Sequence, residues 1–278
     1  MTYKLIACDL DETLLNQEHR VANRNIAAIK RAQQEYGVKF VPATGRGYAS
    51  VQETLKELGL YDVAEEYVLS FNGGALTENK GNRLLQFKGM PFDKMKELFD
   101  FGLQQDVCIH VYTQEELFVF RMSASEQARF DSGDMVYHHQ ISDSVAFLKE
   151  QTIAKILFQN TDTDYLKSLE PKVSSLTDGQ CEVSYSSNRY MEFNSLGIDK
   201  GQGLRDLAEL LGIEMSETIA VGDNYNDLAM LKAAGLSVAA ANGVPEVKAV
   251  CDYVTQADHN EGVVAELIET YIFNEADA

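Results

Sequence analysis

Long apolar stretches are missing from this 278-residue chain. No apolar run approaches the ~20 residues that a helix needs to cross a bilayer, so we expect no membrane partner. The N-terminal residues lead directly into the apolar run Leu5–Cys8 and reach acidic residues too soon for a secretory leader. These absences predict a cytoplasmic protein.

Basic residues are few: 24 Lys and Arg face 43 Asp and Glu, which gives a formal charge of −19. A nucleic-acid-binding protein needs a basic face that displaces counterions from phosphates, so we expect no nucleic-acid partner. The acidity is most simply a solubility feature. An anionic ligand would need local positive charge from a metal, a lysine or helix N-termini.

Cysteine and histidine are also scarce. The four cysteines contain no Cys-x-x-Cys pair, which is typical of reduced cysteines that serve as small apolar residues. The five histidines show no zinc-binding spacing. The sequence therefore predicts neither a disulfide framework nor a zinc site.

Both ends of the chain show an alternation of strand and helix patterns. The apolar runs Leu5–Cys8, Val38–Val41 and Tyr67–Phe71 are separated by helical segments, an order that indicates a parallel α/β sheet. The alternation returns with a helix at Lys200–Leu211 and a strand at Thr218–Val221. We therefore predict an α/β domain formed by residues 1–88 and 192–278.

The segment between these ends has a different pattern. Alternating strands at Cys108–Tyr112 and Leu117–Arg121 form one expected pair, and Glu182–Tyr185 with Tyr190–Phe193 form another. Paired strands of this kind indicate an antiparallel sheet with helices on one face. We predict that residues 89–191 form an α+β domain inserted into the α/β domain.

Four polar motifs follow predicted strands, at the edge where open α/β sheets bind ligands. The first is Asp9-Leu10-Asp11-Glu12-Thr13, in which the carboxylates of Asp9 and Asp11 are separated by one residue. Burial of both charges would cost several kcal/mol unless a cation or a proton compensates. Taken alone, Asp-x-Asp is equally consistent with a simple turn.

The second motif, Thr44-Gly45-Arg46, offers a hydroxyl and amides at a helix N-terminus, which can bind an anion. Alone, it is better interpreted as a plain strand-to-helix turn. The third motif is Asp199-Lys200-Gly201. A lysine at a helix start is unfavourable for the helix dipole, so it is either a solvated surface residue or close to an anion.

The fourth motif runs from Gly222 to Asp227. Glycine permits the turn, while Asp223, Asn226 and Asp227 offer the oxygen ligands that magnesium prefers. Asp- and Asn-rich turns are common, so this motif alone is only moderately specific.

The order of the four motifs is far more specific than any one of them. Together they resemble the motifs of the haloacid-dehalogenase-like hydrolase superfamily. The large insertion between Thr44 and Lys200 resembles that of its Cof-type sugar-phosphate phosphatases, and Asn72-Gly73 also agrees with this branch. The resemblance implies a Rossmann-like parallel-sheet core domain with an inserted α+β cap domain.

The resemblance also implies a magnesium-dependent phosphatase that acts on small phosphorylated metabolites. Asp9 would be the nucleophile that forms an aspartyl-phosphate, and Asp11 the general acid and base. Magnesium would be held by Asp9, the Asp11 backbone carbonyl and Asp223, with Asp227 orienting the metal site. The implied substrate-binding residues are Leu10, Thr44, Gly45, Arg46, Asn72, Lys200 and Asn226.

Two departures from the branch's pattern concern the loops. Glu12 stands where glycine is usual, and Ala241-Asn242-Gly243 replaces the more usual Asn-Ala pairing. Neither removes a chemical group, so they bear on substrate range rather than on activity.

Two other functions are compatible with the same motifs. A phosphomutase would return the phosphoryl group from Asp9 to its substrate, but mutases usually carry a smaller insertion after the first motif. A non-catalytic regulator that binds a phosphometabolite would not need Asp9, Asp11, Lys200 and Asp223 all intact. The sequence specifies neither the physiological substrate nor the oligomeric state.

Overall fold

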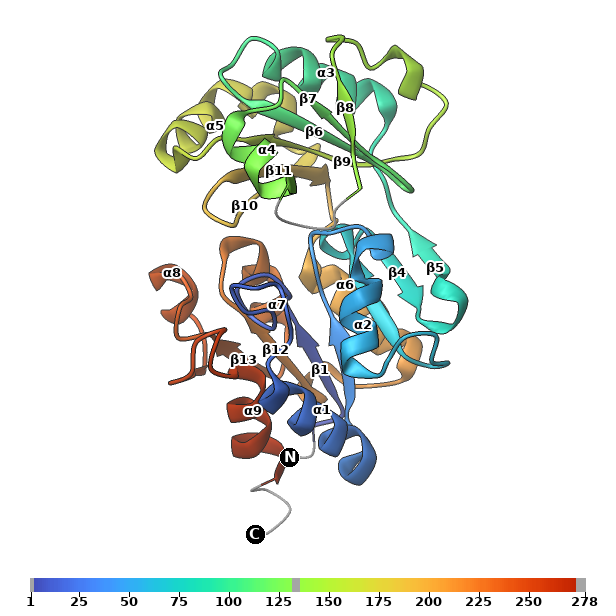
Figure 1. The fold of residues 1–278 in the computed structure, drawn as a ribbon, viewed down its shortest axis with the longest axis vertical. Coiled ribbons are helices and arrows are strands. Elements are labelled where there is room, and N and C mark those ends of the chain that lie inside the picture. The colour runs from blue at the N-terminus through green and yellow to red at the C-terminus, as the bar shows by residue number, and fades with distance from the viewer. Residues whose placement is uncertain (1–2, 132–135, 274–278) are drawn as a thin grey trace. The chain divides into compact units, whose positions relative to one another are not determined.

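The computed structural model describes residues 3–131 and 136–273. The chain divides into two compact units, Met1–Phe87 with Asp199–Ala278, and Lys88–Ile198 (Figure 1). The predicted class is confirmed: an α/β core is interrupted by an α+β unit. The predicted boundary between residues 191 and 192 falls inside strand β11 (Tyr190–Ser195), which pairs with two other strands of the inserted unit.

The first unit is built on a parallel five-stranded sheet in the order β14-β13-β12-β1-β2. Strand β1 lies between β12 and β2, with Cys8 level with Val221 on one side and Pro42 on the other. The three strands therefore end at the same edge of the sheet. Their bounds, with those of the outer strands, are β1 (Leu5–Cys8), β2 (Lys39–Pro42), β12 (Thr218–Gly222), β13 (Leu236–Ala239) and β14 (Tyr253–Val254).

Helices cover both faces of this sheet because its strands are apolar on both sides. Ile6 and Cys8 pack in a core with α1 and α9, whereas Leu5 and Ala7 pack in another core with α6 and α7. Over the described ranges, none of the helices is both long and apolar enough to span a membrane. The helices of this unit are α1 (Asn23–Tyr36), α2 (Gln52–Leu58), α6 (Lys200–Leu211), α7 (Leu228–Ala233), α8 (Pro245–Lys248) and α9 (Val263–Ile268).

The third predicted strand differs from expectation. Strand β3 (Tyr67–Ser70) meets the parallel sheet through a single bridge between Ala43 and Leu69, and otherwise pairs antiparallel with β4 (Ala75–Glu78). The reason is the turn at Phe71–Gly73, which reverses the chain directly and places β4 along β3. Strand β5 (Arg83–Phe87) completes a three-stranded sheet, in which β4 and β5 form a hairpin.

The inserted unit contains a six-stranded sheet in the order β10-β11-β9-β6-β7-β8. The two predicted pairs, β6 with β7 and β10 with β11, are confirmed as antiparallel. Alternate side chains of β6 divide between two layers: Ile109 packs with residues of α3 and α5, while Cys108 packs with Phe130 of α4 on the other face. The bounds are α3 (Phe92–Gly102), β6 (Cys108–Thr113), β7 (Leu117–Phe120), α4 (Ala124–Asp131), β8 (His138–Gln140), β9 (Ile153–Gln159), α5 (Thr163–Thr177) and β10 (Cys181–Ser186).

Candidate active site

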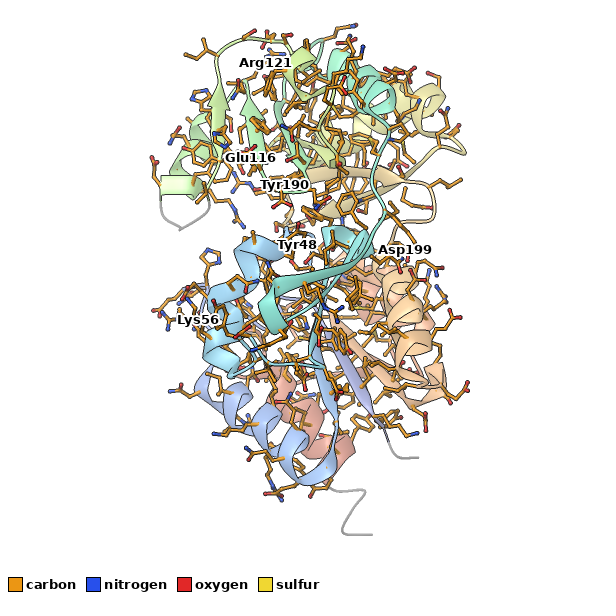
Figure 2. The ribbon with its side chains drawn as sticks, turned by 90° about the vertical axis from the view of Figure 1, so that its right-hand side faces the viewer. Tyr48, Lys56, Glu116, Arg121, Tyr190 and Asp199 are labelled. Atoms are coloured by element: carbon orange, nitrogen blue, oxygen red, sulfur yellow. The ribbon has the colours of Figure 1, made fainter. Side chains whose placement is uncertain are left out.

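The predicted site residues follow strand ends of the first unit. Asp9 comes directly after β1, Thr44 lies two residues after β2, and Asp223 comes directly after β12. Lys200 is the first residue of α6, whose N-terminus is capped by Asp199, labelled in Figure 2: its Oδ1 accepts the Gln202 amide at 2.8 Å. Because the central strands end level with one another, residues distant in sequence meet at one edge.

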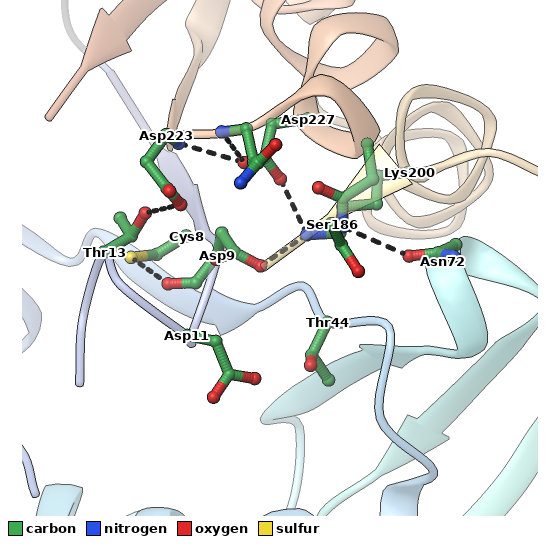
Figure 3. A network of polar contacts seen from close by, with 12 residues as sticks. Cys8, Asp9, Asp11, Thr13, Thr44, Asn72, Ser186, Lys200, Asp223 and Asp227 are labelled. Atoms are coloured by element: carbon green, nitrogen blue, oxygen red, sulfur yellow. Dashed lines mark hydrogen bonds and ion pairs between the residues drawn. The ribbon is translucent and has the colours of Figure 1, made fainter. Parts of the chain in front are cut away.

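Three buried carboxylates and one buried lysine form the centre of the site (Figure 3). Carboxylate oxygens of Asp9, Asp223 and Asp227 all lie within 4.8 Å of one another. Lys200 Nζ donates to Asp9 Oδ1, and to Asp227 Oδ1 at 2.6 Å. The Lys200 side chain is fully buried, so its charge is directed to these acids rather than to solvent.

One lysine does not balance three buried carboxylates. Burial raises the pKa of Asp9 from 3.8 to about 8, and the charge of Lys200 opposes that rise only in part. Burial also raises the pKa of Asp223 well above its usual range, and Asp9 adds to the effect. Burial lowers the pKa of Lys200, but the charges of Asp227 and Asp9 outweigh it and raise the value overall. A divalent cation therefore fits this donor set, because hard oxygen ligands surround a deficit of positive charge.

Backbone and side-chain donors of the protein fix the Asp227 carboxylate. Asp227 Oδ2 accepts the backbone amides of Asp223 and Asn224 at 3.0 and 3.1 Å, while its other oxygen accepts from Lys200. Both oxygens of Asp227 are thus engaged by protein donors. Gly222 makes this close approach possible, since a Cβ there would lie 2.5 Å from Asp227 Cγ.

The residues predicted to hold phosphate come together beside this cluster. The Thr44 hydroxyl accepts the Arg46 amide at 3.0 Å and keeps its own proton to donate. The Thr44 carbonyl accepts the Asn72 amide at 2.9 Å, and Asn226 Nδ2 lies 3.5 Å from Asn72 Oδ1. Three separate loops therefore meet here, with Gly45 half-buried among them.

Two predicted site residues are placed in a way that the sequence did not indicate. The Leu10 side chain is fully buried in the apolar core, so only its main chain could contact a ligand. The Asp11 carboxylate does not join the other three acids but accepts two hydrogen bonds from Arg46, one of them 2.8 Å from Nε to Oδ2.

The sequence interpretation assigned no role to Thr13, which ends the first motif. Its hydroxyl donates to Asp223 Oδ1 at 2.8 Å and so holds this carboxylate in the cluster. A hydroxyl residue two positions after Asp11 was the available signal. The strand-end motifs do not reveal which of several acids such a hydroxyl contacts.

The two departures from the branch's pattern meet in the structure. Glu12 adopts a left-handed backbone conformation, with φ 62°, which explains why glycine is usual at this position. Asn242 Nδ2 donates to the Glu12 carbonyl at 2.7 Å, and Asn242 Oδ1 accepts the His259 amide at 3.1 Å. Asn242 therefore ties the strained loop after Asp11 to the C-terminal part of the core.

Comparisons with the sequences of known proteins indicate the family of this chain. Residues 6–267 match the model of a family described as haloacid dehalogenase-like hydrolase. The protein YxeH of Bacillus subtilis strain 168 is 32% identical over 266 residues, which cover 94% of this chain and 96% of YxeH. The phosphatase YcsE of the same organism, named for 5-amino-6-(5-phospho-D-ribitylamino)uracil, is 28% identical, with coverage of 94% and 92%.

A solved structure gives the same assignment. A haloacid dehalogenase-like hydrolase from Bacteroides thetaiotaomicron is 30% identical, with a TM-score of 0.80 and coverage of 97% of this chain and 99% of that one. Fold, motif order and whole-length similarity therefore coincide. The chain belongs to the haloacid dehalogenase-like hydrolases and, as its motifs predict, to their Cof-type phosphatase branch.

Proposed function

We propose that this protein hydrolyses phosphomonoesters of small metabolites, with magnesium as cofactor and Asp9 as the nucleophile. The observation that carries the proposal is the separation of the two acids in Asp9-Leu10-Asp11. Asp9 lies in the buried cluster with Lys200, whereas the Asp11 carboxylate lies outside that cluster (Figure 3). This separation supports a role for Asp9 in attack on phosphorus and a role for Asp11 in proton transfer.

The cluster of Asp9, Asp223 and Asp227 supports magnesium as the cofactor. Asp9, Asp223 and the Asp11 backbone carbonyl would hold the ion, and Asp227 would orient the site through its bonds to Lys200 and to backbone amides. The bound cation would supply positive charge that favours ionised Asp9 and offsets the charge of the phosphate.

In the first half of the reaction, the Thr44 hydroxyl, the Gly45 amide, Asn226 and Lys200 Nζ would hold the phosphate oxygens. An Asp9 oxygen attacks phosphorus, and the bond from phosphorus to the ester oxygen breaks. Asp11 gives its proton to that ester oxygen, so the leaving group departs as an alcohol. The product is an aspartyl-phosphate on Asp9.

In the second half, water attacks the phosphorus of the aspartyl-phosphate. The Asp11 carboxylate takes the proton of this water, and the bond between phosphorus and the Asp9 oxygen breaks. Inorganic phosphate leaves, and both acids return to their starting forms. One ester and one water have become one alcohol and one phosphate.

Sugar phosphates and similar phosphorylated metabolites are the substrate class we propose. The name of YcsE gives a phosphorylated ribityl compound as its substrate, which supports the class. At 28% identity the substrate of one relative does not transfer to this chain.

The experiment that tests the proposal measures phosphate release from a panel of small phosphoesters, with magnesium and with chelator. We expect release by the wild type that needs magnesium and that disappears in Asp9→Asn, whose amide cannot act as the nucleophile. Asp143→Asn, at an exposed position of the inserted unit, is the matched control. Wild-type rates from Asp9→Asn, once deamidation is excluded, would disprove the covalent mechanism.

A further inference from the structure

Arg46 contacts Asp11 with both ends of its guanidinium group. Nε donates to Asp11 Oδ2 at 2.8 Å, and a terminal nitrogen donates to Asp11 Oδ1. The two side chains are 19% and 23% exposed, so the pair is partly shielded from water. A two-pronged contact of this kind fixes the plane of a carboxylate as well as its position.

The backbone that carries Arg46 is itself held in place. Its amide donates to the Thr44 hydroxyl at 3.0 Å, and its carbonyl accepts the Phe71 amide at 2.9 Å. The next residue, Gly47, packs so closely on the Phe71 ring that a Cβ would lie 2.9 Å from the ring edge. The start of the Arg46 side chain is therefore fixed on both sides, and the guanidinium reaches Asp11 from a rigid support.

Two roles for Arg46 can be separated by chemistry. The family resemblance implies that Arg46 binds the substrate, alongside Thr44 and Gly45. The structure instead engages two of its nitrogens with the acid that the proposed mechanism uses for proton transfer. A phosphate-binding group acts on every phosphoester equally, whereas a group that places a general acid matters most when the leaving oxygen needs a proton.

We propose that Arg46 is a positioning residue for Asp11: it holds the carboxylate away from the metal-binding acids and oriented toward the ester oxygen. This inference rests on the proposed phosphatase function, since it assigns Arg46 to the proton-transfer step of that reaction. The guanidinium itself neither takes nor gives a proton.

The test compares two leaving groups in wild type, Arg46→Gln, Arg46→Lys and Asp11→Asn, using kcat/KM, which reports the step in which the ester bond breaks. The leaving group of p-nitrophenyl phosphate is p-nitrophenolate, a stable anion that needs no proton, whereas the glycerol oxygen that leaves glycerol phosphate does need one. Arg46→Gln should lower kcat/KM for glycerol phosphate by about 10- to 100-fold, with little change for p-nitrophenyl phosphate. Arg46→Lys should restore part of the loss.

Two further readouts distinguish placement from phosphate binding. Inorganic phosphate should inhibit Arg46→Gln as strongly as it inhibits wild type. Adding Arg46→Gln to Asp11→Asn should lower kcat/KM for glycerol phosphate little further. Equal losses for both esters, weaker inhibition by phosphate, or an undiminished loss beside Asp11→Asn would overturn the inference. So would a normal rate on glycerol phosphate.

Failure of this inference is distinct from failure of the proposed function. Wild-type turnover by Asp9→Asn would remove the covalent mechanism whatever Arg46 does. An inactive Asp9→Asn together with an Arg46→Gln variant that loses both esters equally would keep the phosphatase and remove the positioning role. Thermal unfolding of each variant shows that the comparison is made between folded proteins.

Discussion

Both units of the molecule bury ionisable groups, but they balance them differently. In the inserted unit, Lys155 on β9 pairs with Glu192 on β11, and both side chains are at most 3% exposed. Glu192 also accepts the Ser186 hydroxyl, and Lys155 lies 5.0 Å from the centre of the Tyr112 ring. Each charge of this pair has a partner within the protein.

A second acid of the inserted unit follows the same rule. Glu126 is fully buried on α4, and burial raises its pKa. The hydroxyl of Tyr190, labelled in Figure 2, donates to it at 2.6 Å, and an Arg189 nitrogen lies 3.2 Å from its other oxygen. A hydroxyl donor and a positive charge therefore accompany this acid, although its Oε2 accepts no hydrogen bond from the described residues.

The core departs from this balance at the strand ends: within residues 3–131 and 136–273, Lys200 is the one basic side chain that pairs with Asp9 and Asp227, and Asp223 has no ion pair. Buried charge with too few partners is costly, so it marks a place where something else binds. The number of buried charges in a unit therefore does not identify a functional site. Buried charge that the protein's own groups leave uncompensated does identify one.

Breaking the ion pair between Lys155 and Glu192 should change the free energy of unfolding most. Lys155→Met leaves the Glu192 carboxylate buried without the lysine charge that balances it, so we expect the free energy of unfolding to fall by about 3–5 kcal/mol in urea titrations followed by circular dichroism. Adding Glu192→Leu should restore most of the loss, because no charge then remains unpaired. A single variant as stable as wild type would show that the pair is not a structural element.

Binding of magnesium at the three acids of the core should have the next largest effect on the free energy of unfolding. Magnesium at 100 times its Kd should raise the free energy of unfolding by about 2.7 kcal/mol, which thermal unfolding can detect. Asp223→Ala should need much more magnesium for the same stabilisation and for turnover. An unchanged magnesium titration in this variant would remove Asp223 from the metal site.

The same imbalance predicts how stability depends on pH. In the unfolded chain Asp9 loses its proton near the ordinary value of 3.8, whereas the folded protein keeps the proton until about pH 8. Between these values the folded state binds more protons, so stability in chelator should fall as pH rises. Asp9→Asn should flatten this fall, and equal slopes for both proteins would contradict the assignment.

The smallest effect concerns the strained loop beside the cluster. Glu12→Gly removes a side chain from a left-handed conformation at φ 62°, so the free energy of unfolding should rise by up to about 1 kcal/mol. Glu18→Gly, at an exposed position nearby, is a control that should bring no gain. A loss of stability in Glu12→Gly would mean that the Glu12 side chain makes contacts that outweigh the strain.

The strand-end motifs could be predicted from sequence because parallel strands bring their carboxyl ends to one edge. That rule alone brings Asp9, Thr44 and Asp223 together, whatever their separation in sequence. The contact between Arg46 and Asp11 could not be predicted. It depends on the path of the chain from Thr44 to Phe71 and on side-chain torsions. Neither of these follows from a periodic pattern of apolar residues.

The fold shows the same division between regular and irregular structure. The strand β1 and the helix α6 have strong apolar patterns, and they were expected over their observed residues. The pairing of β3 was not foreseen, because one turn at Phe71–Gly73 decides its neighbour. Hydrophobic pattern specifies which segments are buried, while single turns specify which segments pair.

The sheet order has a consequence for the newly made chain. Strand β1 is synthesised first but lies between β2 and β12, and β12 is encoded some 180 residues after β2. At about 5–20 residues per second, one edge of β1 waits roughly ten to forty seconds on the ribosome for its partner. The inserted unit emerges during that interval and can fold while the core stays open. An exposed strand edge can pair wrongly, so this delay is the stage at which the nascent core is open to misfolding.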